Sequence, residues 1–239
     1  METSRPSPVT APSALASPDR KVPPDAGRRA LILLAVAVGL MAVLLGLGFL
    51  LTTTGLGAAI SAADLAALQW LVDRRTAGMD SATTVMSGFA STTVVLVAGL
   101  VVALVASRVL RRWWPAVLMS LALLGELALF ISSAQIVGRE RPAVPHVDPA
   151  LPPTSSFPSG HTAAAICLYG GVAAIVLITA RGWWRWLVLA VAVLVMLAVA
   201  VARVYRGAHH PSDVVGSMLL AVPWLLAVVY TVRPTPALR

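Results

Sequence analysis

Three short segments of this chain concentrate polar and charged residues beside long apolar stretches. They are Gly138–Pro142 (GRERP), Phe157–Thr162 (FPSGHT) and Arg203–Asp213 (RVYRGAHHPSD). Their histidine, serine, arginine and aspartate side chains serve nucleophilic attack, proton transfer and anion binding in proteins. Because zinc sites draw on several of the same residue types, metal binding and anion chemistry both have to be considered for these segments.

The middle segment predicts a helix N-terminus that could bind an anion. Ser159 is a preferred N-cap residue, a helix would begin at Gly160, and the alanines at 163–165 favour its continuation. The first amides of a helix attract anions, and a glycine there lets an anion approach the backbone. His161 would then stand in the first turn, beside a bound phosphate. For Pro158–His161 alone, an ordinary helix start without any anion explains these residues equally well.

The third segment has the spacing of an oriented nucleophile. Pro211 suits the first turn of a helix, which puts Asp213 within reach of the His209 ring. A carboxylate on one imidazole nitrogen fixes the tautomer and frees the other nitrogen for attack. Arg203, six residues before His209, could offer a planar fork of donors to phosphate oxygens, and Arg141 could do so from the first segment.

A zinc site is the competing use of some of these side chains. Its ligands would be His161, His209, His210 and Asp213. Two nearby arginines would repel a dication and attract an anion, so phosphate chemistry is the preferred interpretation. No metal ion and no cofactor are therefore expected.

Other polar residues of the chain are not expected to be catalytic, except for one acid whose role is open. We interpret Arg139 and Arg206 as solvated loop charges, and His210 and His146 as loop residues. Cys167 stands alone in an apolar run and is expected to be a small buried helix residue. Glu126 is an acid deep within an apolar stretch, where structural and functional explanations both stay open.

The elements that must position these residues are membrane helices. Of the 239 residues, 58% are hydrophobic and 12% are charged, which excludes an ordinary soluble domain. The apolar residues come in blocks of about twenty, the length that crosses roughly 30 Å of hydrocarbon. The net charge of +8 is scattered between these blocks, so nucleic-acid binding is not expected.

The pattern predicts an all-α polytopic membrane protein with six spans in one domain, residues 30–232. The expected spans are Ala30–Thr52, Phe89–Ala106, Pro115–Gln135, Gly160–Ala180, Trp184–Ala202 and Ser212–Val232. Ala62–Leu71 is expected to form an amphipathic helix in the membrane interface. Residues 1–29 are expected to be a disordered cytoplasmic tail, and residues 233–239 a short cytoplasmic C-terminal tail.

Counting Lys and Arg predicts the orientation, because cytoplasmic segments retain positive charge. With the N-terminus inside, twelve of the 18 basic residues lie on the cytoplasmic side. They are Arg5, Arg20, Lys21, Arg28, Arg29, Arg108, Arg111, Arg112, Arg181, Arg185, Arg233 and Arg239. All three polar segments then fall on the outer face, and so do the six remaining arginines, four of which lie within those segments.

At this point the sequence resembles a known family. Pro158-Ser159-Gly160-His161, Arg203-x5-His209-x3-Asp213 and the upstream Arg141-Pro142 are similar to the signature of the type 2 phosphatidic acid phosphatase (PAP2) superfamily. That superfamily includes bacterial undecaprenyl-diphosphate phosphatases and soluble vanadium haloperoxidases. The resemblance runs from about Pro115 to the C-terminus, and the joint spacing is specific where each piece alone is not.

The resemblance implies a six-helix membrane fold with an outward-facing, metal-independent site. His209 would be the nucleophile that forms a phosphohistidine, Asp213 its orienting partner, and His161 the acid that protonates the leaving oxygen. The phosphate would be held by Arg141, Arg203, Ser159 and the Gly160 amide.

Two positions depart from the family pattern. A lysine usually stands seven positions before the arginine of Arg-Pro, where this chain has Ala134. The serine that usually precedes the second arginine is Ala202. One phosphate-binding cation is thus missing, with Arg139 as its candidate substitute, so weaker activity or an altered substrate is expected.

The leading functional hypothesis is a lipid phosphatase of the bacterial inner membrane, with its site on the extracytoplasmic face. Its substrate would be phosphatidic acid, phosphatidylglycerol phosphate or a polyprenyl diphosphate. Two alternatives stay open: a phosphotransferase that passes phosphate from His209 to an acceptor other than water, and a non-catalytic membrane protein that retains an anion site. No Gly/Pro-broken pair of spans supports a transporter.

Overall fold

The computed structural model describes residues 25–148, 151 and 154–234. Within these residues the chain forms eight helices and no strand. In chain order the helices are α1 (Ala26–Thr53), α2 (Gly55–Val72), α3 (Ala77–Gly88), α4 (Thr92–Leu110), α5 (Trp114–Val137), α6 (Gly160–Thr179), α7 (Trp184–Tyr205) and α8 (Pro211–Val232). The predicted all-α membrane architecture is confirmed.

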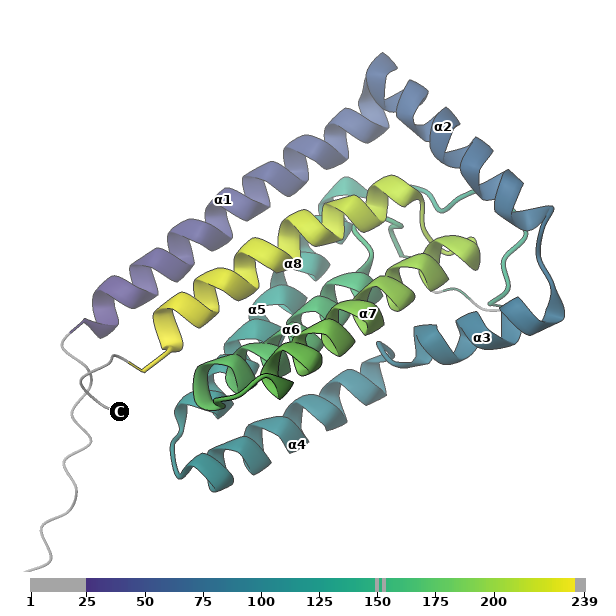
Figure 1. Ribbon diagram of the computed structural model, residues 1–239. Helices are drawn as coiled ribbons and strands as arrows, with labels where there is room; N and C mark the ends of the chain where they lie inside the picture. Colours follow the sequence, from purple (N-terminus) through teal and green to yellow (C-terminus); the bar gives the residue numbers. More distant parts are fainter. Residues whose placement is uncertain (1–24, 149–150, 152–153, 235–239) are drawn as a thin grey trace, which may run out of the picture.

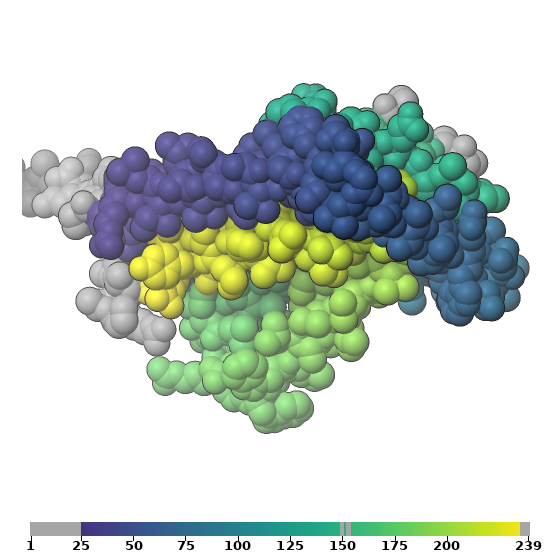
Figure 2. Space-filling model, turned by 90° about the horizontal axis from the view of Figure 1, so that it is seen from above, coloured from purple at the N-terminus to yellow at the C-terminus, as the bar shows by residue number. Residues whose placement is uncertain are grey.

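Six of these helices form a bundle whose members run alongside one another (Figure 1). They are α1 and α4 to α8, and they correspond to the six predicted spans, with boundaries that agree within four residues. Helix α6 is central, since it packs against α4, α5, α7 and α8. Figure 2 shows α1 lying along α8 on the outside of the bundle.

The segment between the first two bundle helices differs from the prediction. The helix expected over Ala62–Leu71 is part of the longer α2, a further helix, α3, follows it, and α4 begins at Thr92 instead of Phe89. Among the described residues, α2 is a seventh helix that is long and apolar enough to cross a membrane. It turns away from α1 and runs across one end of the bundle (Figure 1). This placement brings α2 to the ends of α7 and α8.

The N-terminal boundary is also corrected. Residues 26–29 were expected to belong to the tail, but they form the first turn of α1. The Arg29 guanidinium pairs with Asp25 at 2.7 Å and donates to the Thr231 carbonyl at 2.6 Å, which ties the start of α1 to the end of α8. The rest of the predicted tails, residues 1–24 and 235–239, lies outside the described residues.

A close approach between α5 and α8 defines one side of the core. Gly125 leaves room for the Trp224 ring, because a Cβ at this glycine would lie 2.0 Å from that ring. The Trp224 indole nitrogen donates to the carbonyls of Leu121 and Ala122, both at 3.2 Å. Glu126, the next residue of α5, is 3% exposed, as the apolar pattern around it predicted. Large apolar side chains on the outside of the bundle remain exposed, as in proteins that face lipid.

Candidate active site

The structure brings the three polar segments together at one end of the bundle. That end holds the C-termini of α5 and α7 and the N-termini of α6 and α8. Ser156 N donates to the Arg139 carbonyl at 2.8 Å, which joins the first segment to the loop before α6. The Arg141 Nη1 atom donates to the Ala208 carbonyl at 2.8 Å, which joins the first segment to the third.

The ring of His209 is held in one tautomer by a backbone carbonyl. Its Nδ1 atom lies 2.6 Å from the Ser156 carbonyl oxygen, which can only accept, so Nδ1 carries the proton. The Nε2 atom therefore has a lone pair available for attack. Burial, reinforced by the positive charge of Arg203, lowers the pKa of His209 to about 3, so the ring is neutral at physiological pH. This is the charge state that a histidine nucleophile requires.

Asp213 does not make the hydrogen bond to His209 that its spacing predicted. Its Oδ2 atom is 3.9 Å from His209 Nδ1, beyond hydrogen-bond distance, and accepts from the His210 amide at 2.8 Å. Its Oδ1 atom accepts from Arg139 at 2.6 Å. Asp213 thus stabilises the turn that carries His209 and His210, and the Ser156 carbonyl orients the His209 ring.

Arg139 is the main correction to the sequence-based interpretation. It is 5% exposed and is not a solvated loop charge. One terminal nitrogen donates to Asp213 and Ser212 at 2.6 and 2.7 Å, and the other to Asp64 and Ser61 of α2 at 3.3 and 2.9 Å. Both terminal nitrogens are thus engaged with carboxylates and hydroxyls of α2 and α8.

Asp64 is a buried member of this network that the sequence analysis did not identify. It is 6% exposed on α2 and accepts from the Ser212 amide at 3.3 Å and from the Ser212 hydroxyl. The ion pairs Asp64–Arg139 and Arg139–Asp213 form a continuous chain from α2 to the N-terminus of α8. The only signal in the sequence was an acid within an apolar helix, which requires a partner when it is buried.

A second charged cluster lies at the end of α7. Arg206, also interpreted as a solvated charge, is 4% exposed and binds Asp148 through Nε at 3.1 Å and through Nη2. Arg203 donates from Nη1 to Asp148 at 3.3 Å and to Ser87 of α3 at 2.9 Å. Burial raises the pKa of Asp148, but its bonds and charge contacts with the two arginines outweigh burial and hold that pKa below its usual range.

Arg203 retains unused hydrogen-bonding capacity. Its Nε atom is buried and has no hydrogen-bond partner among the residues that the structure describes. A buried donor without a partner costs free energy, and such a group in a native site calls for an explanation such as a ligand. The sequence predicted that Arg203 binds phosphate oxygens, and this open donor fits that role.

Arg141 and His161 complete the set of predicted residues. Arg141 also donates to the Thr154 hydroxyl at 3.2 Å, and burial lowers the pKa of its guanidinium. His161 stands in the first turn of α6 and is half-buried. The positive charges of Arg141 and Arg203 both act on His161 and His209.

The start of α6 confirms the predicted boundary and corrects its details. Ser159 is the N-cap and Gly160 the first helical residue. The Ser159 hydroxyl pairs with the Thr162 hydroxyl at 3.0 Å instead of capping a backbone amide. A Cβ at Gly160 would lie 2.8 Å from the Phe130 ring, so packing against this ring is the structural reason for a glycine here.

The loop before α6 is anchored on α8 through an aromatic ring. Phe157 is fully buried, and a Cβ at Gly216 would lie 2.4 Å from its ring. The hydroxyl of Ser156 donates to the Glu140 carbonyl at 2.9 Å. These contacts fix the position of the Ser156 carbonyl that orients His209.

No group of three or more His, Cys, Asp or Glu side chains among the described residues is arranged to hold a metal ion. Three of the four residues weighed as zinc ligands make other contacts: His209 with the Ser156 carbonyl, and Asp213 with Arg139 and the His210 amide.

The comparison with protein families decides the classification. The PAP2 superfamily matches residues 115–236, just over half of the 239 residues. This chain belongs to the PAP2 superfamily. The match begins at α5 and covers all three polar segments, as the sequence resemblance predicted.

A solved structure shows the same fold. The crystal structure of a transmembrane PAP2-type phosphatidylglycerolphosphate phosphatase from Bacillus subtilis matches with a TM-score of 0.68 and 23% sequence identity. The match covers 80% of this chain and 93% of that protein. No curated protein sequence matches the chain significantly. With its apolar helices and this fold, the chain is a multi-pass membrane PAP2 protein.

Proposed function

We propose that this protein is a lipid phosphatase in which His209 is the nucleophile. The observation that carries the proposal is the 2.6 Å contact between His209 Nδ1 and the Ser156 carbonyl, which leaves Nε2 unprotonated in a buried ring. A neutral, oriented imidazole is the form that attacks phosphorus. The buried Arg203 beside it supplies the positive charge that the phosphate oxygens require.

Two arginines and a helix N-terminus would bind the phosphate. Arg203 offers its unused Nε donor, and Arg141 provides a second guanidinium. The first-turn amides of α6, at Gly160 and His161, have no partners within their own helix and add further donors. Asp148 is bound to Arg203 in this structure, so substrate binding would compete with this carboxylate for the guanidinium.

The reaction would take place in two balanced steps. In the first, His209 Nε2 forms a bond to phosphorus, the bond from phosphorus to the lipid oxygen breaks, and His161 gives its proton to that leaving oxygen. In the second, His161 accepts a proton from water, which attacks phosphorus and breaks the phosphorus–nitrogen bond. Inorganic phosphate leaves, and both histidines return to their starting protonation states.

The proposed substrate is a phosphorylated lipid, since the site stands at the end of membrane-spanning helices. Phosphatidic acid, phosphatidylglycerol phosphate and polyprenyl diphosphates are the candidates. The structural neighbour, named a phosphatidylglycerolphosphate phosphatase, supports a lipid substrate by analogy. The distribution of basic residues supports a bacterial inner membrane protein whose site faces outward.

The test is labelling with a ³²P-labelled lipid phosphate, followed by quenching in alkali, where phosphohistidine survives. Wild-type protein should carry acid-labile label, and His209→Ala should carry none. His146→Ala is the matched control, because His146 lies exposed in the loop after α5 and should label normally. Persistent labelling of His209→Ala would place the nucleophile elsewhere and refute the proposal.

A second variant tests the acid. His161→Ala should slow phosphoenzyme formation from a lipid phosphate by about 10²- to 10⁴-fold, the usual contribution of a positioned acid. It should slow the reaction of p-nitrophenyl phosphate much less, because that leaving group needs little protonation. Equal losses on both substrates would exclude His161 as the acid. Transfer of label to an added alcohol would indicate a phosphotransferase.

A further inference from the structure

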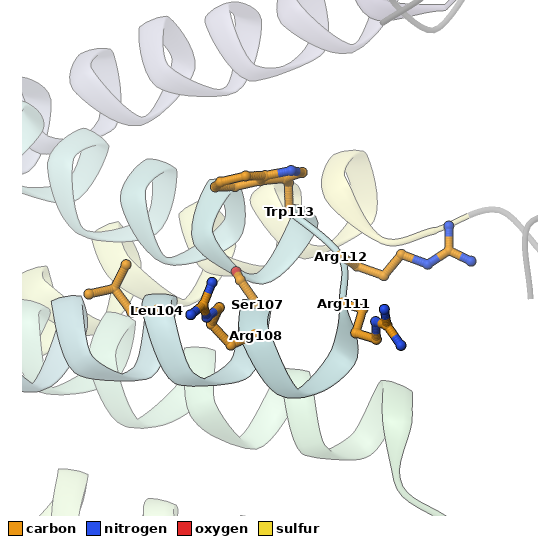
Figure 3. A pocket seen from close by; sticks show the side chains of 6 residues that line it. All are labelled: Leu104, Ser107, Arg108, Arg111, Arg112 and Trp113. Carbon is orange, nitrogen blue, oxygen red and sulfur yellow. The ribbon is translucent and has the colours of Figure 1, made fainter. Parts of the chain in front are cut away.

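An open basic groove lies at the end of the bundle opposite the candidate active site. It is formed where α4 ends and α5 begins, and its volume is about 680 Å³, within the roughly 300–1,000 Å³ of small-ligand sites. Its lining residues, drawn in Figure 3, are Leu104, Ser107, Arg108, Arg111, Arg112 and Trp113. The 24 residues of α5 separate this groove from the candidate active site by about 36 Å.

The lining of the groove is strongly cationic. Three of its six residues are arginines, and none of these six residues is acidic. Guanidinium groups stay protonated at all physiological pH values and bind phosphate oxygens through paired donors. Arg108 alone could be explained as a cation in the last turn of α4, where it complements the helix dipole. That explanation does not extend to the arginine that follows the helix.

Arg111 occupies a backbone position that favours glycine. It is the C-terminal cap of α4 with φ of 53°, and it is the one non-glycine residue with positive φ among the described residues. The Arg112 amide donates to the Ser107 carbonyl at 3.1 Å, the bond of a glycine-ended helix. Helix α5 ends in the same conformation with Gly138, whose φ is 63°. The left-handed backbone of Arg111 is therefore strained, because this residue has a Cβ that glycine lacks. Backbone strain of this kind is often found at functional sites.

The groove also has an apolar part. Leu104 is 55% exposed on the side of α4, and Trp113 is 73% exposed at the start of α5. In Figure 3 Leu104 and Arg108 lie along α4 on one side of Ser107 and the Trp113 ring lies above it, while Arg111 and Arg112 extend to the other side from the turn after α4. Tryptophan favours the boundary between hydrocarbon and headgroups. Apolar surface next to arginines at this boundary fits an amphipathic ligand better than a free anion.

We propose that this groove binds the phosphate headgroup of an anionic phospholipid, in the leaflet opposite the candidate active site. Arg108, Arg111 and Arg112 contact the headgroup, and Leu104 and Trp113 contact the glycerol and upper acyl region. Charge complementarity identifies the ligand: the groove is cationic, so an anionic headgroup is preferred over a zwitterionic one. The proposal does not depend on the function of the other site, because it concerns binding alone.

The decisive variant is Arg111→Gly, which removes the charge and also relieves the strained backbone. Full-length protein, delipidated in detergent, is titrated with phosphatidylglycerol or phosphatidylcholine, and bound lipid is counted by native mass spectrometry. Wild-type protein should retain phosphatidylglycerol preferentially. Arg111→Gly should bind it about five-fold more weakly, the effect of one basic residue near an anionic lipid surface. Its unfolding temperature should equal or exceed that of the wild type, so misfolding cannot explain the loss.

Arg181→Gln is the matched control. Arg181 lies exposed in the loop between α6 and α7, at the same end of the bundle, and does not line the groove. This variant loses the same charge and should retain phosphatidylglycerol as the wild type does. Wild-type binding by Arg111→Gly, or an equal loss in Arg181→Gln, would overturn the proposal. So would complete displacement of the lipid by millimolar inorganic phosphate, since that would identify the ligand as a free anion.

Discussion

Replacing Arg139 by glutamine should be the most damaging single change to the candidate site that leaves both histidines in place. The guanidinium makes four hydrogen bonds and stands between Asp64 and Asp213, which are 6% and 0% exposed. Removing it leaves two buried carboxylates close together with no cation between them. Breaking a buried ion pair by deleting one partner costs about 3–5 kcal/mol, and two carboxylates lose their partner here, so the upper part of that range is expected.

A double-mutant cycle separates this ion-pair chain from a simple packing defect. Asp64→Asn removes one of the two negative charges, so the double variant Asp64→Asn with Arg139→Gln contains only the Asp213 charge. The double variant should be more stable than the sum of the single effects predicts, by about 1–3 kcal/mol, as for residues of one ion-pair network. A packing defect would give additive losses instead.

The assay is thermal unfolding in detergent, combined with the rate of phosphoenzyme formation. Arg139→Gln should slow that rate because Asp213 holds the turn that carries His209. Arg74→Gln is the control, since Arg74 is an exposed arginine and should change stability by less than about 0.5 kcal/mol. Equal stability of Arg139→Gln and Arg74→Gln would refute the reasoning, and so would a cycle without coupling.

Three further predictions concern pH, metal dependence and orientation. The pKa of His209 is about 3 in the folded protein and about 6.5 in the unfolded chain. Between these two pH values only the unfolded chain takes up a proton at this histidine. The folded state therefore loses stability as the pH falls through this range. Lowering the pH from 7 to 5 should therefore destabilise the wild type by about 2 kcal/mol more than His209→Gln, measured by thermal unfolding. Excess EDTA should leave phosphatase activity intact and vanadate should inhibit it; recovery of lost activity on adding Mg²⁺ or Zn²⁺ would contradict a site built from arginines and backbone donors. A cysteine at exposed Ala143, beside the candidate site, should react with a membrane-impermeant thiol reagent in intact cells, while buried Cys167 should not. Labelling only after lysis would place the site on the cytoplasmic face.

The helices and the location of the site were predictable because their signals are local. Six apolar stretches of membrane-spanning length correspond to α1 and α4 to α8. The start of α6 at Gly160 followed from an N-cap serine and helix-forming alanines. Topology then placed the three polar segments at one end, since consecutive spans must alternate in direction.

The partners of the buried charges were not predictable, because they are distant in the sequence. Arg139 pairs with Asp213 and Asp64, which are 74 and 75 positions away in the sequence. Arg206 pairs with Asp148, which is 58 positions away. Each of these arginines stands among polar residues in the sequence, and such surroundings are typical of a charge in a solvated loop. Burial depends on what packs over a residue: here α2 lies across the end of the bundle, and α3 packs against α7.

The orientation of His209 shows the same limit at the level of single atoms. The spacing from His209 to Asp213 was compatible with a hydrogen bond, but Asp213 is occupied by Arg139 and His210. The group that holds the ring is the Ser156 carbonyl, 53 residues away. Every residue has a carbonyl, so residue types alone contain no signal for this contact. By itself the sequence determined the residue types available for chemistry and the end of the bundle where they meet. The tertiary structure decided which groups bond, because it alone sets the distances between segments that are far apart in the chain.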